Sequence, residues 1–289
     1  MSLAYAIVDV FTDMPLHGNQ LAVFEDGSAL SDDQMQRLAR EMNLSETVFL
    51  LPAENGGDAR MRIFTPGAEL PFAGHPVLGT AFVVGESRHL TSVRLETAAA
   101  AVPLELTRSR PPGSSRDGMG EITFAWMRQP IPVWGPFPAA AELLAALGVA
   151  ESGLPVESYT NGPTHVYVEL PDEAAVSALK PDLTALAEFS GAAAYCFAGA
   201  GRRWRSRMFA PGIGITEDPA TGSAAGPLAI HLARHGRIAF GEEIEIRQGA
   251  EVGRPSVLHA RATGSPAGIE SVDVGGAAVI VARGEFRRW

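Results

Sequence analysis

The chain has 289 residues, of which 46% are hydrophobic and 19% charged, and its formal net charge is −10. Such a composition is typical of a globular protein with a substantial core, and the length accommodates two domains. The negative charge argues against a general surface for nucleic acid or anionic membrane, and a single cysteine, Cys196, excludes an intramolecular disulfide and a thiolate-rich metal site. The sequence shows no basic, apolar leader and no apolar run long enough to span a bilayer, so the expected location is cytoplasmic.

The first third of the chain predicts strands around one amphipathic helix and one buried helix. Strand patterns at residues 5–10 and 21–24 flank a Gly-Asn turn. Ser31 and Gln34 form a capping-box pattern, and the apolar residues after them recur at helical spacing, which predicts a helix over residues 32–42. Residues 76–84 are apolar on every side, which predicts a short helix buried on all faces.

The rest of the chain predicts a second set of similar elements. Strand patterns at residues 121–126 and 164–170 alternate with an Ala/Leu helix near residues 139–147, and residues 224–235 form a second apolar helix. The polar, Gly- and Pro-rich segment 108–120 predicts a loop. We therefore expect one domain over residues 1–117, with residues 277–289 packing back on it, and another over residues 118–276.

One stretch of the sequence occurs twice. RIFTPGAELPFAGHP begins at Arg62, and RMFAPGIGITEDPATGSA begins at Arg207. Both copies read Arg-x-Phe-x-Pro-Gly and then Glu-x-Pro-x-x-Gly, with three extra residues between the two blocks in the second copy. The repeat predicts two similar halves, each a β-rich shell around one central apolar helix, in which residues 62–84 and 207–235 have equivalent topology.

Each copy of the repeat ends with glycine at the beginning of a helix. Gly74 and His75 begin the first helix, and Gly222 and Ser223 begin the second. Glycine lets a ligand approach the backbone, and the N–H groups and dipole of a helix start favour an anion. A single start of this kind is more often an ordinary helix cap, but two related starts favour a binding site for an anion.

Three ionisable residues accompany these helix starts. Glu46 lies at the junction of the first helix and the strand TVFLL, His75 is in the first repeat, and Asp218 is just before the second apolar helix. A lone histidine, or an aspartate before a helix, is more often structural. Their position at elements that would converge on one cleft makes them candidates, because a partly desolvated carboxylate can act as an acid or base near neutral pH.

Two further patterns carry less weight. Arg203, Arg205 and Arg207 alternate along one face of a predicted strand, where we expect salt bridges across a dimer or domain interface. His231 and His235 are four apart on a helix, but the segment HLARH lacks the glutamate of a zinc-protease motif, so we expect no metal. The sequence contains no phosphate-binding glycine motif, which argues against a nucleotide cofactor.

Four segments of the chain resemble, in order, the signature segments of the PhzF family, the phenazine-biosynthesis isomerases and their relatives. They are VDVFTDMPLHGNQLAVF, MNLSETVFL, RIFTPGAELPFAGHPVLGTA and GITEDPATGSAAGPLA. The resemblance covers nearly the whole chain, and QPIPVWG and YTNGPTHVYVELP also resemble the phenazine-pathway members. Gln20 departs from the family, which usually has proline after Asn19, and this affects only the local turn.

The resemblance implies an α+β fold of the diaminopimelate-epimerase type. This fold has two homologous domains, each with a β-barrel-like sheet around a central helix, an active site in the cleft between them, and a homodimeric assembly. The implied activity is the isomerisation of trans-2,3-dihydro-3-hydroxyanthranilate to an aminoketone, with Glu46 as the proton shuttle and His75 and Asp218 assisting.

The resemblance further implies which residues bind the substrate and what the reaction needs. Ser45, Gly74, Gly222 and Ser223 would hold the substrate's carboxylate and polar substituents. No metal or redox cofactor is expected, because the substrate's own conjugated system carries the charge. The expected partner is the small-molecule substrate, with no nucleic acid and no membrane.

Two alternatives belong to other classes of function. One is a cofactor-independent isomerase or epimerase of another small amino or carboxylic acid, and the other is a non-catalytic binding protein of the same fold. Epimerases that resemble this fold use one thiol from each half, whereas here Ala73 and Thr221 precede the two glycines. A binding protein would have lost acid/base residues, and all three candidates are present. The isomerase is therefore the favoured function.

Overall fold

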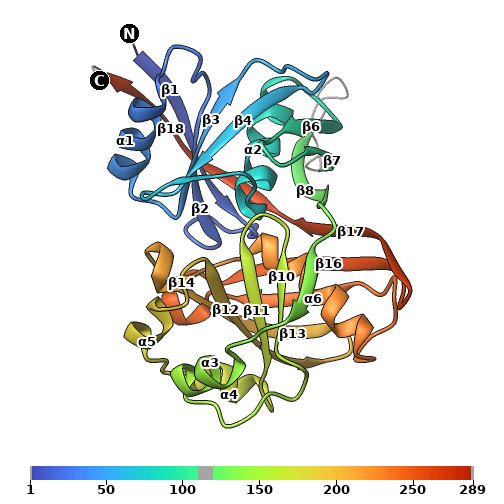
Figure 1. The fold of residues 1–289 in the computed structure, drawn as a ribbon. Helices are drawn as coiled ribbons and strands as arrows, with labels where there is room; N and C mark the ends of the chain where they lie inside the picture. The colour runs from blue at the N-terminus through green and yellow to red at the C-terminus, as the bar shows by residue number, and fades with distance from the viewer. Residues whose placement is uncertain (1, 110–119, 288–289) are drawn as a thin grey trace. The chain divides into compact units, whose positions relative to one another are not determined.

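The computed structural model of the chain describes residues 2–109 and 120–287. The chain divides into two compact units, Met1–Arg128 with Gly275–Trp289, and Gln129–Val274, drawn in Figure 1. The predicted loop at 108–120 and the predicted boundary after residue 117 fall on residues that lie almost wholly outside the described part. The predicted domain limits therefore stay a prediction.

The first unit combines eight longer strands with two helices and one two-residue strand. Its elements are β1 (Ser2–Val10), β2 (Asn19–Phe24), α1 (Asp32–Met42), β3 (Glu46–Leu51), β4 (Ala59–Phe64), β5 (Glu69–Leu70), α2 (Gly74–Ser87), β6 (Ser92–Glu96), β7 (Ala101–Ser109), β8 (Glu121–Arg128) and β18 (Ala278–Arg287). The strands pair in the order β18-β1-β2-β3-β4-β6-β7-β8. The β2–β3 and β4–β6 pairs are parallel, and the others are antiparallel.

Helix α2 is the centre of the first unit. It contacts β1, β2, β3, β6, β7, β8 and β18, and its residues from Gly74 to Gly85 are all buried. Gly79 allows this packing, because a Cβ at this position would come within 2.7 Å of Val10 and 2.8 Å of Leu21. The prediction of a helix buried on every face is confirmed.

Helix α1 lies on the outside of the same sheet, against β3 and β4. Its capping box is formed as predicted, with the Ser31 hydroxyl accepting from the Gln34 backbone N–H and the Gln34 side chain accepting from the Ser31 N–H. Met35, Leu38 and Ala39 face the sheet and are buried. The amphipathic helix predicted over residues 32–42 is confirmed.

The second unit repeats the plan of the first. Its elements are β9 (Val133–Pro136), α3 (Ala140–Leu147), β10 (Glu157–Thr160), β11 (Thr164–Glu169), α4 (Glu173–Ala178), α5 (Leu183–Ala187), β12 (Ala192–Ala200), β13 (Arg203–Ala210), η1 (Pro211–Ile213), β14 (Ile215–Asp218), α6 (Gly222–Arg234), β15 (Ile244–Gln248), η2 (Ala250–Val252), β16 (Ser256–Ser265) and β17 (Gly268–Gly276), which runs on into the first unit. The strands pair in the order β9-β10-β11-β12-β13-β15-β16.

The strand pairings of the two units correspond. The β11–β12 and β13–β15 pairs are parallel, as β2–β3 and β4–β6 are, and β14 pairs with β13 as β5 pairs with β4. In both copies of the repeat a strand is followed by a short antiparallel strand and then by a buried helix. The equivalence predicted for residues 62–84 and 207–235 is confirmed at the level of topology.

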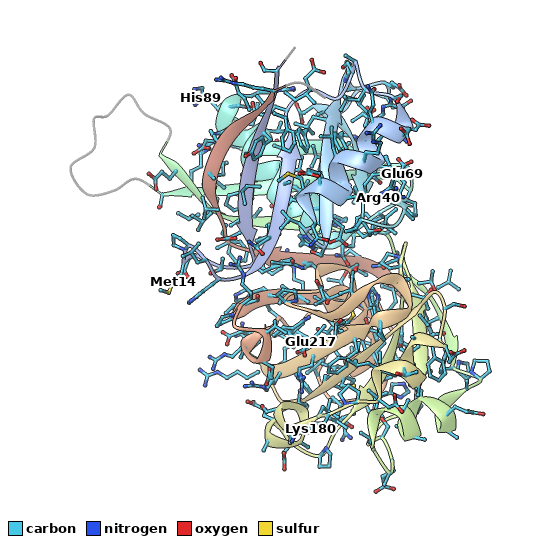
Figure 2. The ribbon with its side chains drawn as sticks, turned by 90° about the vertical axis from the view of Figure 1, so that its left-hand side faces the viewer. Met14, Arg40, Glu69, His89, Lys180 and Glu217 are labelled. Atoms are coloured by element: carbon cyan, nitrogen blue, oxygen red, sulfur yellow. The ribbon has the colours of Figure 1, made fainter. Side chains whose placement is uncertain are left out.

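The arginine and the glutamate of the repeat form the same contact in both copies. Arg62 Nε donates to Glu69 Oε1 over 2.7 Å, and Arg207 Nε donates to Glu217 Oε1 over 2.8 Å. Each guanidinium also lies over the phenylalanine two residues later, 5.1 Å from the ring centre of Phe64 and 4.9 Å from that of Phe209. Figure 2 labels Glu69 and Glu217 in the two units.

These ion pairs correct one prediction. Arg207 is bound to Glu217, and Arg205 Nη2 lies 2.6 Å from Glu251 Oε1, so both arginines have their partners inside the second unit. The expected salt bridges across a dimer or domain interface are wrong for these two residues. The reason is local: β14 and the segment after β15 bring carboxylates to the arginine face of β13.

Candidate active site

The first unit brings Glu46 and His75 together. Glu46 is the first residue of β3, and His75 is in the first turn of α2. Both side chains are buried, with the residues 7% and 3% exposed, and His75 Nε2 lies 3.4 Å from Glu46 Oε2. A carboxylate and an imidazole at this separation can share or exchange a proton through a small movement.

A chain of polar side chains orients the imidazole. The Ser45 hydroxyl donates to Asn19 Oδ1 over 3.0 Å, and Asn19 Nδ2 lies 3.2 Å from His75 Nδ1. An amide nitrogen is a donor, so the Asn19 contact favours the neutral tautomer that accepts at Nδ1 and carries its proton on Nε2, which faces Glu46. Asn19, known from the sequence only as part of a turn, is therefore the residue that aligns His75 with Glu46.

Burial keeps this imidazole neutral. It lowers the pKa of His75 to about 3, although a hydrogen bond with the backbone of Gln20 favours the charged form. Charging a ring inside the core is unfavourable because the interior solvates an ion poorly. Near neutral pH, His75 is thus neutral, and its Nε2 lies 3.4 Å from the carboxylate without a charged ion pair and without a hydrogen bond between Nε2 and Oε2.

The second unit brings Asp218, Gly222 and Ser223 to the beginning of α6. Asp218 is the last residue of β14, and the Thr221 hydroxyl donates to its Oδ2 over 2.7 Å. Ser223 is in the first turn of α6, and its hydroxyl lies 3.5 Å from His165 Nε2. All of these side chains are buried.

His165 is a polar residue that sequence reasoning missed. It lies on β11, is 1% exposed, and burial lowers its pKa to about 3, so its imidazole is neutral near pH 7. The only signal for it in the sequence was its place in the segment YTNGPTHVYVELP, which gives no sign of the contact with Ser223.

Neither apolar helix begins with a side-chain cap. The residues before them, Ala73 and Thr221, make no side-chain hydrogen bond to the first turn of α2 or of α6. The first backbone N–H groups of a helix have no partner within the helix, and they carry the positive end of its dipole. Anion binding at the starts that contain Gly74 and Gly222 stays a prediction.

The seven predicted site residues thus form two groups. One group in the first unit consists of Ser45, Glu46, Gly74 and His75, and the other in the second unit consists of Asp218, Gly222 and Ser223. Within each unit the members come from a strand end and the start of the central helix. Their roles in binding and catalysis stay predictions.

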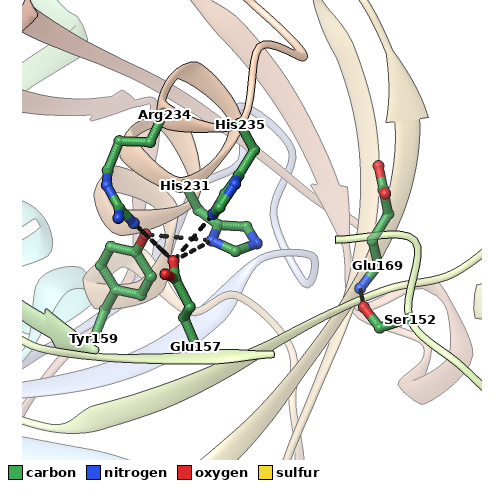
Figure 3. Close-up of polar contacts among 7 residues, drawn as sticks. All are labelled: Ser152, Glu157, Tyr159, Glu169, His231, Arg234 and His235. Carbon is green, nitrogen blue, oxygen red and sulfur yellow. Dashed lines mark hydrogen bonds and ion pairs between the residues drawn. The ribbon is translucent and has the colours of Figure 1, made fainter. Parts of the chain in front are cut away.

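The two histidines of HLARH belong to a different cluster, shown in Figure 3. His231 Nδ1 and His235 Nε2 each lie 3.2 Å from Glu157 Oε2, and these three ligand atoms lie within 4.8 Å of one another. The same oxygen accepts from Arg234 Nη1 over 2.7 Å and from the Tyr159 hydroxyl over 2.9 Å. A guanidinium on the shared oxygen competes with any metal cation, so the geometry favours a hydrogen-bond network.

The same contacts and burial determine the charge states of Glu157 and His231. Burial opposes ionisation of Glu157, but hydrogen bonds from His231, Arg234, His235 and Tyr159 outweigh it and hold its pKa well below the usual range. Burial also lowers the pKa of His231. The cluster is therefore an ionised carboxylate paired with Arg234, beside His231, whose charged form burial disfavours. Glu157 had no recognisable signal in the sequence.

The model of the family of phenazine biosynthesis-like proteins matches residues 8–284. The chain belongs to this family. It is 54% identical over 280 residues to a trans-2,3-dihydro-3-hydroxyanthranilate isomerase of Pseudomonas chlororaphis, with 97% of this chain and 98% of the relative covered. A protein of the same name from Pseudomonas aeruginosa is 52% identical over the same shares of the two chains. A more distant member, an uncharacterised isomerase of Escherichia coli K12, is 32% identical, with 96% of each chain covered.

Solved structures of the family have the same fold. A PhzF-family protein of Bacillus anthracis superimposes with a TM-score of 0.82 at 25% identity, covering 100% of both chains. A predicted epimerase of Pseudomonas aeruginosa gives 0.81 at 34% identity, covering 99% of this chain and 100% of that one. A probable proline racemase of Agrobacterium radiobacter K84, at 15% identity and a TM-score of 0.65, shares the fold over 99% of this chain and 93% of its own. The predicted α+β fold of the epimerase type is confirmed.

Among the described residues, no helix has the length and apolar character that a membrane crossing requires.

Proposed function

We propose that this protein is a trans-2,3-dihydro-3-hydroxyanthranilate isomerase. The proposal is supported by 52–54% identity, over nearly the full chain, to relatives that carry this name. The observation that carries it in the structure is the buried pair of Glu46 and neutral His75, with Nε2 and Oε2 3.4 Å apart. This pair supplies what an unassisted carbon acid needs, namely a buried carboxylate base with a neutral imidazole beside it.

In the proposed mechanism Glu46 carries one proton between two carbons of the ring. Its carboxylate removes the proton from the hydroxyl-bearing carbon, and the C–H electron pair enters the conjugated system of the ring. Glu46, now protonated, returns the proton to the carboxyl-bearing carbon, and the enol that results relaxes to the ketone. The reaction is an isomerisation, so no atom is gained or lost and no oxidant or cofactor is required.

The neighbouring groups have supporting roles. His75, whose Nε2 lies 3.4 Å from Glu46 Oε2, is close enough to donate to the carboxylate after a small movement while the carboxylate gains and loses the proton. Asp218 assists proton transfer at the substituents, and Ser45 and Ser223 bind polar groups of the substrate. The backbone N–H groups at Gly74 and at Gly222 bind anionic or polar groups of the substrate, because each helix start lacks a side-chain cap.

Two observations favour this function over the alternatives. An epimerase that uses two thiols needs cysteine before the helix-start glycines, and this chain has Ala73 and Thr221 there. A protein that only binds its ligand has no need for a buried carboxylate facing an imidazole that burial keeps neutral, which Glu46 and His75 provide. We also propose that the protein is a cytoplasmic homodimer, which size-exclusion chromatography with light scattering tests.

The decisive experiment is incubation with trans-2,3-dihydro-3-hydroxyanthranilate, followed by ultraviolet absorbance and mass spectrometry. The expected result is loss of the substrate chromophore with no change in mass. Substrate deuterated at the hydroxyl-bearing carbon should carry part of its label to the carboxyl-bearing carbon, because one carboxylate serves both positions. No turnover by folded protein would overturn the proposal, and complete loss of label to solvent would exclude a single shuttle.

A further inference from the structure

A chain of buried hydrogen bonds leads to Asp218 from the core of the second unit. The Tyr195 hydroxyl donates to Ser206 Oγ over 2.9 Å, and the Ser206 hydroxyl donates to Gln248 Oε1 over 3.3 Å. Gln248 Nε2 donates to Thr221 Oγ1 over 2.9 Å, and the Thr221 hydroxyl donates to Asp218 Oδ2 over 2.7 Å. All five residues are buried.

The contacts of Gln248 fix the orientation of its amide. Nε2 also donates to the backbone oxygen of Asp218 over 2.8 Å, and Oε1 accepts from the backbone N–H of Thr221 over 3.2 Å. A flipped amide would set its NH₂ group against the Thr221 N–H and its oxygen against the Asp218 carbonyl. Both ends of the amide therefore select the orientation observed.

This orientation determines where the Thr221 hydrogen points. A hydroxyl has one hydrogen, and Thr221 Oγ1 already accepts from Gln248, so its own hydrogen is directed to Asp218 Oδ2. An oxygen that accepts a short hydrogen bond is a less favourable place for a proton. The Thr221 hydroxyl therefore disfavours a proton on Oδ2 of Asp218.

Close packing also fixes the backbone beside these hydrogen bonds. Gly249, directly after Gln248, has φ of +81°, and a Cβ there would collide with the carbonyl oxygens of Pro219 and Arg254. Only glycine allows this close approach together with a positive φ. The segment between Asp218 and Thr221 is therefore seated against the end of β15, where Gln248 is located.

We propose that Gln248 is a positioning residue that acts through Thr221 to determine which oxygen of Asp218 exchanges a proton with the substrate. The proposal rests on the proposed function, in which Asp218 assists proton transfer. Neither Gln248 nor Thr221 touches the substrate in this assignment. Tyr195, the ionisable group that faces Asp218 from β12, stays neutral, because burial and the Asp218 charge hold its pKa well above the usual value despite its hydrogen bond with Ser206.

Isosteric substitutions of the two residues test the assignment. Thr221→Val removes the hydroxyl, and it should lower kcat on the order of 10- to 100-fold with KM nearly unchanged, since a misplaced catalytic group costs rate at this scale. Thr221→Ser keeps the hydroxyl and should retain most of the activity. Thr80→Val is the matched control, because it removes a buried threonine hydroxyl of α2 that has no hydrogen-bond partner, and kcat should not change.

A double-mutant cycle tests the coupling between the two positions. Gln248→Met should lower kcat by about tenfold in the wild-type chain and have almost no further effect in Thr221→Val, since residues that act in series are not additive. Multiplicative effects, or equal losses in Thr221→Val and Thr221→Ser, would overturn the proposal. If Gln248→Met does not fold, as judged by circular dichroism, the comparison of the valine and serine variants decides alone.

A readout that does not depend on turnover separates this proposal from the proposed function. The carboxyl carbon of Asp218, labelled with ¹³C and assigned with Asp218→Asn, reports its titration by NMR. Its midpoint should move to higher pH in Thr221→Val and stay in place in Thr221→Ser, because a carboxylate that loses a donor is harder to ionise. An unchanged midpoint in Thr221→Val would refute the positioning role, whatever the wild-type protein does with the substrate.

Discussion

The starts of α2 and α6 share a backbone plan and differ in their side chains. Each helix follows a short antiparallel strand, begins at a glycine without a side-chain cap and is buried in the middle of its unit. At α2 the first turn carries His75, which faces Glu46 from β3. At α6 it carries Ser223, and the nearby Asp218 is held by the Thr221 hydroxyl. The duplicated scaffold thus supplies two helix starts without side-chain caps, and the start of α2 has the buried carboxylate of Glu46 facing the imidazole of His75.

This difference indicates how the two halves divide the work. A reaction that inverts one carbon is served by matched groups on both sides, whereas moving a proton between two unlike carbons needs one shuttle and a partner that holds the substrate. The unequal pairs of Glu46 with His75 and Asp218 with Thr221 fit the second case. Four predictions test or sharpen this comparison.

Replacement of Glu46 should have the largest effect on kcat. Glu46→Gln keeps the size of the side chain but cannot accept a proton, so kcat should fall on the order of 10²- to 10⁴-fold or more, while substrate binding is retained. Steady-state kinetics and calorimetric binding of an anthranilate-type analogue measure the two quantities. Asp218→Asn, the counterpart in the second unit, should cost less, and Glu41→Gln on the exposed side of α1 should cost nothing. Residual activity of Glu46→Gln above about a tenth would assign the base to Asp218 or His75.

The ion pairs near the C-terminal ends of α2 and α6 should contribute differently to the free energy of unfolding. Glu157→Gln removes the charge that binds Arg234, His231 and His235, and the partly buried guanidinium loses its partner. The free energy of unfolding should fall by about 1–3 kcal/mol, the cost of leaving a hydrogen-bonded group without its partner. Glu86→Gln near the end of α2 is the control, because its pair with Arg283 is half exposed and surface pairs contribute about 0–1 kcal/mol. Equal losses in urea denaturation would show that the Glu157 cluster carries no special stability.

The buried histidines should make the protein sensitive to acid. The pKa of His75 and that of His165 are each lowered to about 3 by burial, so the unfolded chain binds protons at pH 5 that the folded chain does not. Stability is then present above the ordinary histidine pKa near 6.5 and is lost as the pH falls below it, by about 2 kcal/mol for each residue at pH 5.

Urea denaturation at pH 7.5 and pH 5 measures this loss. His75→Asn and His165→Asn should each reduce the difference between the two pH values by about 2 kcal/mol, which would show that the two units keep their histidines neutral for the same reason. His89→Asn on the surface is the control and should leave the difference unchanged. A variant of either buried position with the wild-type difference would contradict the assignment of that residue.

The smallest effect is expected on the arginine face of β13. Arg203 is exposed at the beginning of this strand, and its removal in Arg203→Ala should change kcat and KM by no more than about twofold, as for most surface substitutions. A large rise in KM would mean that the substrate binds over this face, and the anion sites at Gly74 and Gly222 would then lose their assignment.

Local patterns in the sequence were enough to predict the central helices and the repeat. The capping box joins Ser31 and Gln34, which are three positions apart, and the apolar runs of α2 and α6 mark burial directly. The positions of Glu46, His75 and Asp218 beside the helix starts made them candidates, but their catalytic roles came from a family resemblance, because no local pattern distinguishes them from structural residues.

The contacts that orient these groups could not be predicted, because they join distant segments. Asn19 and His75 are 56 residues apart, and Gln248 and the Asp218 carbonyl are 30 apart. Glu157 meets His231 across 74 residues. Such pairs follow from strand order and register, which the alternation of residues along one strand does not contain.

The pairing of β18 with β1 determines which of the two units can be completed first during translation. It pairs with β1 from Ser2 opposite Arg287 to Val10 opposite Ala278, although the whole second unit lies between them in the chain. During translation the second unit therefore emerges complete while β1 still has an open edge, and open edges are where growing chains aggregate. The N-terminal half of this protein is thus the last to be finished on the ribosome, and a stalled or shortened C-terminus damages the half that was made first.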